Sequence, residues 1–185
     1  MREDLKMNPE ETDLIVKYSL SNEETLTLAI KVALAYPALR RRIFSDFLCH
    51  LQEKVQEALG SDWLTVVEID AWVGISARRR KWPETISLGV RSDGVAGRYV
   101  YLWVKRFNAL LREGQTDEML KCELDEQVGK GGTTKEAAWW MSPSKHRDWG
   151  TEGALVELYN RQRAAEYLTN LIVRIAEVVD SVVGP

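Results

Sequence analysis

The chain has 185 residues, of which 45% are hydrophobic and 29% charged, and its formal net charge is −3. This composition is typical of a globular domain that buries a core without metal or disulfides, and the net charge does not favour nucleic acid. Two cysteines, a polar N-terminus and the lack of a long apolar run argue against a secreted or membrane-spanning chain. We therefore expect a soluble, cytoplasmic protein with no membrane partner.

The first part of the chain follows a helical period. An Asn-Pro-Glu-Glu start predicts a short helix over residues 9–20. A second apolar stripe predicts a helix over 22–37, which Pro37 interrupts or ends. A third helix is expected over 38–59, before a glycine that stops it.

The period then changes to two, which indicates strands. Residues 65–74 are rich in β-branched side chains and predict one strand. Residues 85–90 and 98–104 alternate, and the Ser-Asp-Gly turn at 92–94 predicts an antiparallel hairpin between them. In the last of these strands the alternation separates two faces. One face carries Val100, Leu102 and Val104, and the other carries Tyr99, Tyr101 and Trp103.

The pattern after this hairpin is less regular. Residues 116–127 predict an acidic surface helix, and the Gly-Lys-Gly-Gly stretch at 129–132 predicts a flexible loop. Residues 137–141 fit either an edge strand or a short helix. A threonine cap followed by a long apolar stripe predicts a final helix over 151–183.

The order of these elements predicts the fold class. Helices come first, then a small sheet, then a helix, which is typical of an α+β fold. We expect a small antiparallel sheet of three to five strands packed against the N-terminal helices and a long C-terminal helix. The whole chain, 1–185, is interpreted as a single domain, helical over 1–60, a hairpin sheet over 64–108 and the long helix over 151–183.

Candidate catalytic groups are few. Glu68 and Asp70 lie two residues apart on a predicted strand, so both point to one face, where they could bind a divalent metal through oxygen ligands. Carboxylate pairs are common and nothing completes such a site, so a solvated strand face is the favoured interpretation of the pair. Ser144, His146 and Asp148 are close in sequence, but triads usually draw on separate elements, so the segment is interpreted as a polar connection. The sequence thus assigns no catalytic residue, no metal ligand and no cofactor.

Aromatic and basic residues are the most informative feature. A basic run ending in a tryptophan, residues 78–82, is expected in the connection between two strands. Aromatic rings beside arginines dock protein partners, and they also stack bases and hold phosphates. The alternative is that helices cover both sheet faces and the rings are core. The candidate binding residues are Trp72, Arg78, Arg79, Arg80, Lys81, Trp82, Tyr99, Tyr101 and Trp103.

Aromatic spacing supports one family resemblance. Residues 82–88 followed by the Tyr-Val-Tyr-Leu-Trp-Val segment at 99–104 resemble the non-catalytic C-terminal region of some bacterial PD-(D/E)XK-superfamily proteins. There a Trp-led strand precedes a Tyr-rich strand, and Trp149 with the final helix fits the same pattern. The resemblance implies an accessory or recognition module from a bacterium, phage or mobile element. It carries over no catalytic residue, because the acid-x-Lys motif is absent after Glu68 and Glu84.

Three functions follow from these observations. The first is a non-enzymatic binding module that uses the aromatic and basic surface to dock a protein partner, with nucleic acid as the alternative ligand. The second is a small metal-dependent hydrolase or nuclease-related protein that uses Glu68 and Asp70. The third is a structural homodimer, paired through the apolar stripe of the final helix.

Overall fold

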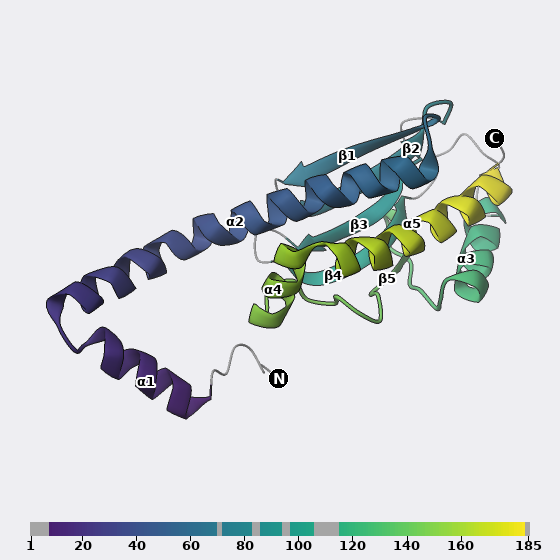
Figure 1. The fold of residues 1–185 in the computed structure, drawn as a ribbon. Coiled ribbons are helices and arrows are strands. Elements are labelled where there is room, and N and C mark those ends of the chain that lie inside the picture. Colours follow the sequence, from purple (N-terminus) through teal and green to yellow (C-terminus); the bar gives the residue numbers. More distant parts are fainter. Residues whose placement is uncertain (1–7, 70–71, 83–85, 94–96, 106–114, 184–185) are drawn as a thin grey trace.

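The computed structural model describes residues 8–69, 72–82, 86–93, 97–105 and 115–183 (Figure 1). The strands form one antiparallel sheet in the sequential order β1-β2-β3-β4-β5. The α+β class and the sheet of three to five strands are therefore confirmed. In chain order the elements are α1 (Pro9–Ser19), α2 (Glu23–Leu59), β1 (Trp63–Ile69), β2 (Trp72–Arg79), β3 (Leu88–Asp93), β4 (Arg98–Lys105), α3 (Gln115–Gln127), β5 (Ala137–Met141), α4 (Glu152–Asn160) and α5 (Gln162–Val183).

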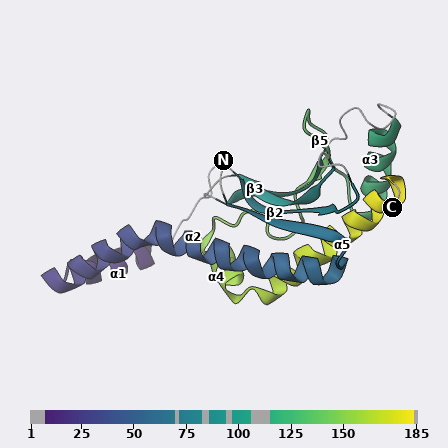
Figure 2. The ribbon, with the colours of Figure 1, turned by 90° about the horizontal axis from the view of Figure 1, so that it is seen from above.

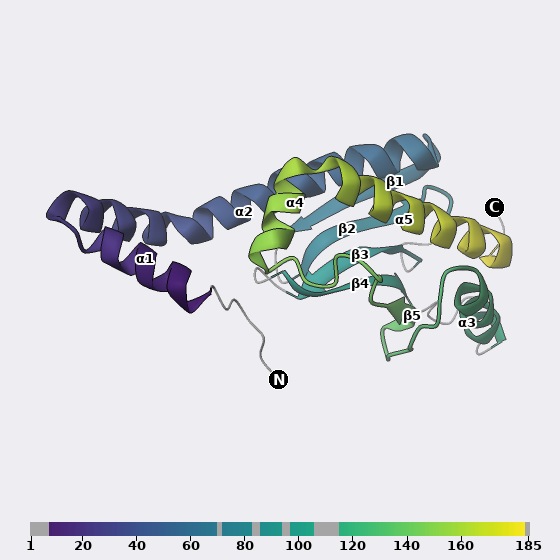
Figure 3. The ribbon, with the colours of Figure 1, turned by 60° about the horizontal axis from the view of Figure 1, so that its bottom comes forward.

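The helices α2, α4 and α5 all lie on one side of the strands (Figures 2 and 3). The C-terminal half of α2 packs against β1 and β2, and α5 packs against β3 and against α2. The helix α3 packs at the end of the molecule against α5 and β5. Among the helices of the described residues, none has the length and apolar character needed to cross a bilayer.

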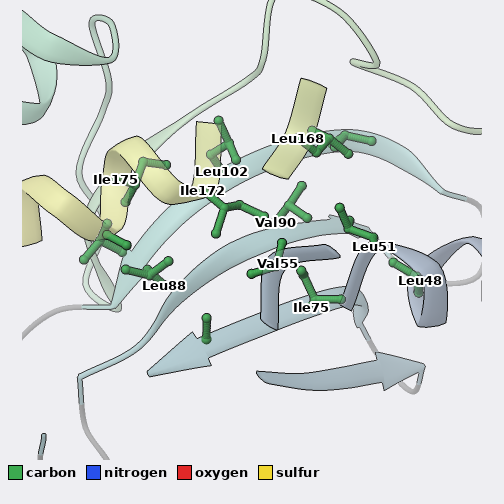
Figure 4. Close-up of a cluster of buried hydrophobic side chains, with 14 of the residues drawn as sticks. Leu48, Leu51, Val55, Ile75, Leu88, Val90, Leu102, Leu168, Ile172 and Ile175 are labelled. Carbon is green, nitrogen blue, oxygen red and sulfur yellow. The ribbon is translucent and has the colours of Figure 1, made fainter. Parts of the chain in front are cut away.

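The core lies between α2, α5 and the sheet, as Figure 4 shows. Each side chain labelled there is at most 1% exposed, and burying one of this size contributes roughly 1.5–3 kcal/mol. The apolar stripe of the final helix is thus packed within the chain. It is therefore not available as the dimer interface that the sequence suggested. The labelled residues are Leu48, Leu51, Val55, Ile75, Leu88, Val90, Leu102, Leu168, Ile172 and Ile175.

Two helix boundaries differ from the prediction. The helix α2 runs through Pro37 without ending, after a capping box in which Asn22 and Thr25 bond each other's backbone. The final helix is divided at Arg161, where φ is 59° and the side chain lies 3.6 Å from Asp46 of α2. In both places the local signal, a proline in one case and an unbroken apolar period in the other, does not determine where the helix ends.

The strand prediction was wrong in one place. Residues 65–74 were expected to form one strand, but they span the connection between β1 and β2, whose residues 70–71 lie outside the described part. The basic run is consequently shifted: Arg78 and Arg79 belong to β2, and only residues 80–82 follow it. The β3–β4 hairpin is confirmed by its pairing, while Gly94 in its turn lies outside the described residues. Residues 137–141 form an edge strand, not a helix.

Both edges of the sheet have partners. At the β1 edge, Gln52 donates to the carbonyl of Thr65 at 2.8 Å, and Gln56 donates to the carbonyl of Trp63 at 3.1 Å. At the β5 edge, the backbone N–H of Gly132 donates to the carbonyl of Trp140 at 2.8 Å, and a return bond of 3.0 Å runs from Trp140. The Gly-rich stretch expected to be flexible is therefore held against β5.

The strands β2 and β3 approach each other closely at two glycines. A Cβ on Gly74 would lie 2.1 Å from the carbonyl oxygen of Val90, and one on Gly89 would lie 2.0 Å from that of Ile75. Neither contact can be relieved by a side-chain rotation, because the obstructing atoms belong to the backbone. These two positions therefore require glycine for the strands to pair as they do.

We predict that Gly89→Ala lowers the free energy of unfolding by about 2–4 kcal/mol, because the new methyl group forces β2 and β3 apart. Urea denaturation followed by tryptophan fluorescence measures this change. The matched control is Gly153→Ala in α4, where a Cβ meets nothing within 4 Å and stability should rise by up to about 1 kcal/mol. Equal stability of Gly89→Ala and the parent protein would contradict the close approach.

Candidate functional site

A hollow of about 940 Å³ lies on the sheet face opposite the helices. We call it the aromatic hollow. Its lining combines rings with charges of both signs. The rings are those of Trp72, Tyr101, Trp103 and Trp140, the cations are Arg91, Lys105 and Lys135, and the acids are Glu68 and Glu136.

Strand register places these side chains on one face. Across β1 to β4, Glu68 pairs with Gly74, Gly74 with Arg91, and Arg91 with Tyr101. Paired residues point to the same face. Gly74 in this row and Gly89 in the next row therefore leave the floor of the hollow without side chains of its own. The neighbouring row, from β2 to β5, is Ser76, Gly89, Trp103 and Trp140.

The rings stand edge to face and form walls around the floor. The centroids of Trp72 and Tyr101 are 6.0 Å apart with an interplanar angle of 78°, and those of Tyr101 and Trp140 are 6.2 Å apart at 72°. Burial raises the pKa of Tyr101 above its usual value, although the nearby Arg91 acts in the opposite direction. Trp72 and Trp140 remain exposed, so their rings are accessible to a ligand.

Arg91 is the charged centre of the hollow. Its guanidinium lies 3.7 Å from the ring centroid of Trp103 and 5.7 Å from that of Trp72. Burial lowers the pKa of Arg91. Among the described residues a carboxylate oxygen of Glu68 lies 3.9 Å from the guanidinium and only partly offsets this effect. A desolvated cation of this kind is stabilised by an anion that approaches more closely.

Two hydrogen-bond donors in the hollow are buried without an acceptor among the described residues. They are Nε of Arg91 and Nε1 of Trp103, whose side chain is only 5% exposed although it points away from the helices. Buried donors are normally paired, and leaving one unpaired costs about 1–3 kcal/mol. Both residues line the hollow, although the two nitrogens themselves are covered.

Two of the predicted binding residues pack within the fold. Arg79 donates to Asp180 of α5 at 2.6 Å, so its charge is paired within the fold, between β2 and α5. Trp82 is 5% exposed and stacks edge to face on Trp63, with ring centroids 5.0 Å apart. Neither residue lines the aromatic hollow.

The other members of the basic run also lie outside the hollow. Arg78 shares the open face but lies opposite Leu64, towards one end of β2. Arg80 donates from Nε to the carbonyl of Ser61 at 2.9 Å, and Lys81 is exposed in the turn. The sequence grouped these residues with the rings, and the structure separates them.

Tyr99 does not follow the alternation expected of β4. Arg91 pairs with Tyr101 but Asp93 pairs with Arg98, so β4 contains one extra residue at this point. Tyr99 has a φ of 53° in this bulge, a left-handed conformation that is uncommon for an aromatic residue. Its side chain is highly exposed and is not part of the hollow, whereas Trp72, Tyr101 and Trp103 are brought together there.

Sequence reasoning missed several residues of the hollow. Trp140 was not selected because its segment fitted either a strand or a helix. Arg91 was not selected because it lies just beyond the strand expected over residues 85–90. Arg91 could have been found by extending the period-two pattern of that strand by one residue, which places it on the face opposite Val90 and shared with Tyr101. Glu136 and Lys135 precede β5 and carry no such signal.

The metal hypothesis has no support in the described residues. Glu68 faces Arg91 across the sheet, and Asp70 lies outside the described part. No group of three or more histidine, cysteine, aspartate or glutamate side chains in that part is placed to hold a metal ion.

Ser144, His146 and Asp148 each have a separate partner. The hydroxyl of Ser144 lies 3.0 Å from that of Tyr167, and Nδ1 of His146 lies 3.6 Å from Glu157. The carboxylate of Asp148 accepts from the backbone N–H of Gly150. The three side chains therefore do not form a relay. Burial lowers the pKa of His146, with Glu157 opposing and Lys145 reinforcing the shift.

The depressed pKa of His146 predicts a dependence of stability on pH. Below its unfolded pKa of 6.5 the unfolded chain binds a proton that the folded chain does not, so the free energy of unfolding falls as pH decreases. Urea unfolding between about pH 6.5 and about pH 5 should show this slope, and His146→Asn should reduce it. His50→Asn is the control, which should retain the slope. An identical slope in His146→Asn and the parent protein would exclude His146 as its source.

Comparison of the chain with protein-family models, curated proteins and solved structures gives no match in any of the three. The resemblance to PD-(D/E)XK-superfamily proteins therefore stays a prediction from aromatic spacing. The function has to be argued from the aromatic hollow.

Proposed function

We propose that the protein is a non-enzymatic binding module, and that its aromatic hollow holds an acidic, apolar-anchored segment of a protein partner. The observation that carries this proposal is Arg91, a partly desolvated guanidinium that is held against Trp103, lines the hollow and has no carboxylate oxygen of the described residues closer than 3.9 Å. A carboxylate of the partner would pair with Arg91. An apolar or aromatic side chain would then lie between the rings of Trp72, Tyr101 and Trp140.

The arrangement of the rings favours a protein over a nucleic acid. Bases stack on open, flat ring faces, but here neighbouring rings meet at 72° and 78° and turn their edges toward each other. The acids Glu68 and Glu136 also line the hollow and would repel the several charges of a phosphate backbone more than the single carboxylate of a peptide anchor. The basic run that suggested phosphate binding is outside the hollow.

The size of the hollow fits one anchor rather than a whole surface. Its volume of about 940 Å³ is within the range of pockets that bind small ligands or a few side chains. The floor is backbone, and the walls are rings held by strand pairing, so the site is formed before a ligand arrives. A short peptide segment should therefore be enough for binding.

We predict that a random peptide library displayed on phage yields binders with an acidic residue near an aromatic or branched one. Tyr101→Ala should weaken the selected peptides at least about tenfold, because it removes the ring that contacts both tryptophans. Fluorescence anisotropy with a labelled peptide measures the affinity. The control is Tyr159→Ala, an equally large truncation at an exposed position of α4 that should change nothing.

Two outcomes would count against this proposal. One is a selection without a shared motif, or binding that Tyr101→Ala leaves unchanged. The other is tighter binding of short single-stranded DNA or RNA than of any peptide, lost in Tyr101→Ala, which would favour the nucleic-acid alternative.

Charge substitutions in the hollow should act in opposite directions. We predict that Arg91→Gln weakens an acidic peptide about tenfold or more, because it removes the pairing cation. Glu136→Gln should strengthen the same peptide by a few-fold, because it removes a like charge at the rim. Isothermal titration calorimetry at two salt concentrations measures both affinities, and the gain from Glu136→Gln should shrink at high salt. Weakening by both substitutions would contradict an acidic ligand.

A further inference from the structure

Residues 8–39 form a helical arm that projects away from the sheet (Figure 1). The arm consists of α1, the turn after it and the first part of α2, which pack against each other as a helical hairpin. The helix α1 has no buried residue, and the buried residues of α2 begin only at Phe44. The arm thus contributes nothing to the core described above.

The arm is unusually rich in exposed apolar side chains. All twelve large apolar side chains between Leu14 and Leu39 are at least 39% exposed, out of twenty such exposed side chains in the described residues. A fully exposed side chain of this kind has on the order of 100 Å² of apolar surface. At their observed exposures the twelve side chains of one arm therefore expose about 600 Å² of apolar surface. This concentration of exposed apolar side chains in one segment indicates an interaction site.

The apolar side chains of α2 lie on more than one side of the helix. Ala29 and Thr25 are partly covered, whereas Ile30 and Leu34 lie on another side and Leu34 is 76% exposed. On α1, Leu14 and Tyr18 lie four residues apart on a side that is also uncovered. A two-helix hairpin with uncovered apolar sides on both helices is half of a four-helix bundle.

The distribution of charge along α2 indicates what kind of molecule packs on its exposed apolar side. Glu23 and Arg41 are eighteen positions apart, which is five helical turns, so they lie on one side of α2 about 27 Å from each other. Ile30 and Leu34 lie between them on that side. A stripe with an acid at one end, a base at the other and apolar side chains between is complementary to its own copy in the antiparallel direction.

We propose that the arm, with the adjoining turn of α2 that carries Arg41, pairs two copies of this chain, antiparallel along α2, with Glu23 of each copy beside Arg41 of the other. Ile30 of one copy then packs near Leu34 of the second, around a two-fold axis close to the level of Val32. Two arms together expose on the order of 1,000 Å² of apolar surface, and the pairing covers the part of it that lies on the Ile30 and Leu34 side of α2. This pairing is independent of the aromatic hollow and of its proposed ligand.

The composition of the arm disfavours a membrane surface as the alternative occupant. Between residues 8 and 39 there are five acids and two lysines. Helices that lie in a membrane interface are instead rich in lysine and arginine on their polar side. The five acids would repel anionic lipids, whereas in the pair of chains Glu23 meets an arginine.

The mass of the full chain in solution tests the proposal. Sedimentation equilibrium from low to several hundred micromolar should show a species of twice 21.1 kDa. Leu34→Glu should raise the dissociation constant at least about tenfold, because it places carboxylates in the apolar contact. Val156→Glu, at an exposed position of α4, is the matched control and should leave the mass unchanged. A monomer at all concentrations, or equal behaviour of the two variants, overturns the proposal.

A charge exchange tests the antiparallel direction. Glu23→Arg and Arg41→Glu should each weaken the dimer about two- to fivefold, and the two together should restore it, because every pair is again of opposite sign. In a parallel pair the combination would restore nothing, which would overturn this geometry. Circular dichroism and urea unfolding of each variant verify that the body is folded. Binding of the parent chain to zwitterionic vesicles as a monomer would assign the arm to a membrane and overturn the pairing.

Discussion

The close approach of β2 and β3 is the constraint on which the open face of the sheet depends. At Gly74 and Gly89 the neighbouring backbone occupies the space of a side chain, so the centre of this face carries no side chain of its own. Large side chains can then stand only around this centre, and Arg91 lies across it against Trp103. On the other side of the same strands, Ile75 and Val90 continue into the core. One pair of strands therefore carries a packed face and a hollow one.

The elements that could be predicted from the sequence are those whose signal is local and repeated. The alternation in β4 correctly placed Leu102 toward the helices and Trp103 away from them, and the capping residues located the beginning of α2. The same alternation failed at Tyr99, because a bulge adds one residue without any glycine to mark it. Periodicity thus predicts a face but not the point at which the register changes.

What could not be predicted depends on residues far apart in the chain. The hollow needs Trp140 from β5 beside Tyr101 from β4, and nothing near residue 140 indicates which strand it will join. The break at Arg161 likewise depends on packing against α2, where Asp46 lies close to its side chain. The basic run was misplaced for a related reason, since Arg79 pairs with Asp180, about a hundred positions later. Composition shows that such charges exist, but only the fold determines which of them remain for a ligand.

The glutamines at the outer edge of β1 have a consequence for how the chain behaves when concentrated. A free strand edge offers a row of backbone groups on which strands of other molecules can add, the first step towards aggregates. Here Gln52 and Gln56 of α2 donate hydrogen bonds to two carbonyls of that row, and Gly132 pairs with β5 at the opposite edge. The helix α2, which supplies much of the core, therefore also hinders the addition of strands from other molecules at this edge. Strand-by-strand polymerisation would first have to displace it.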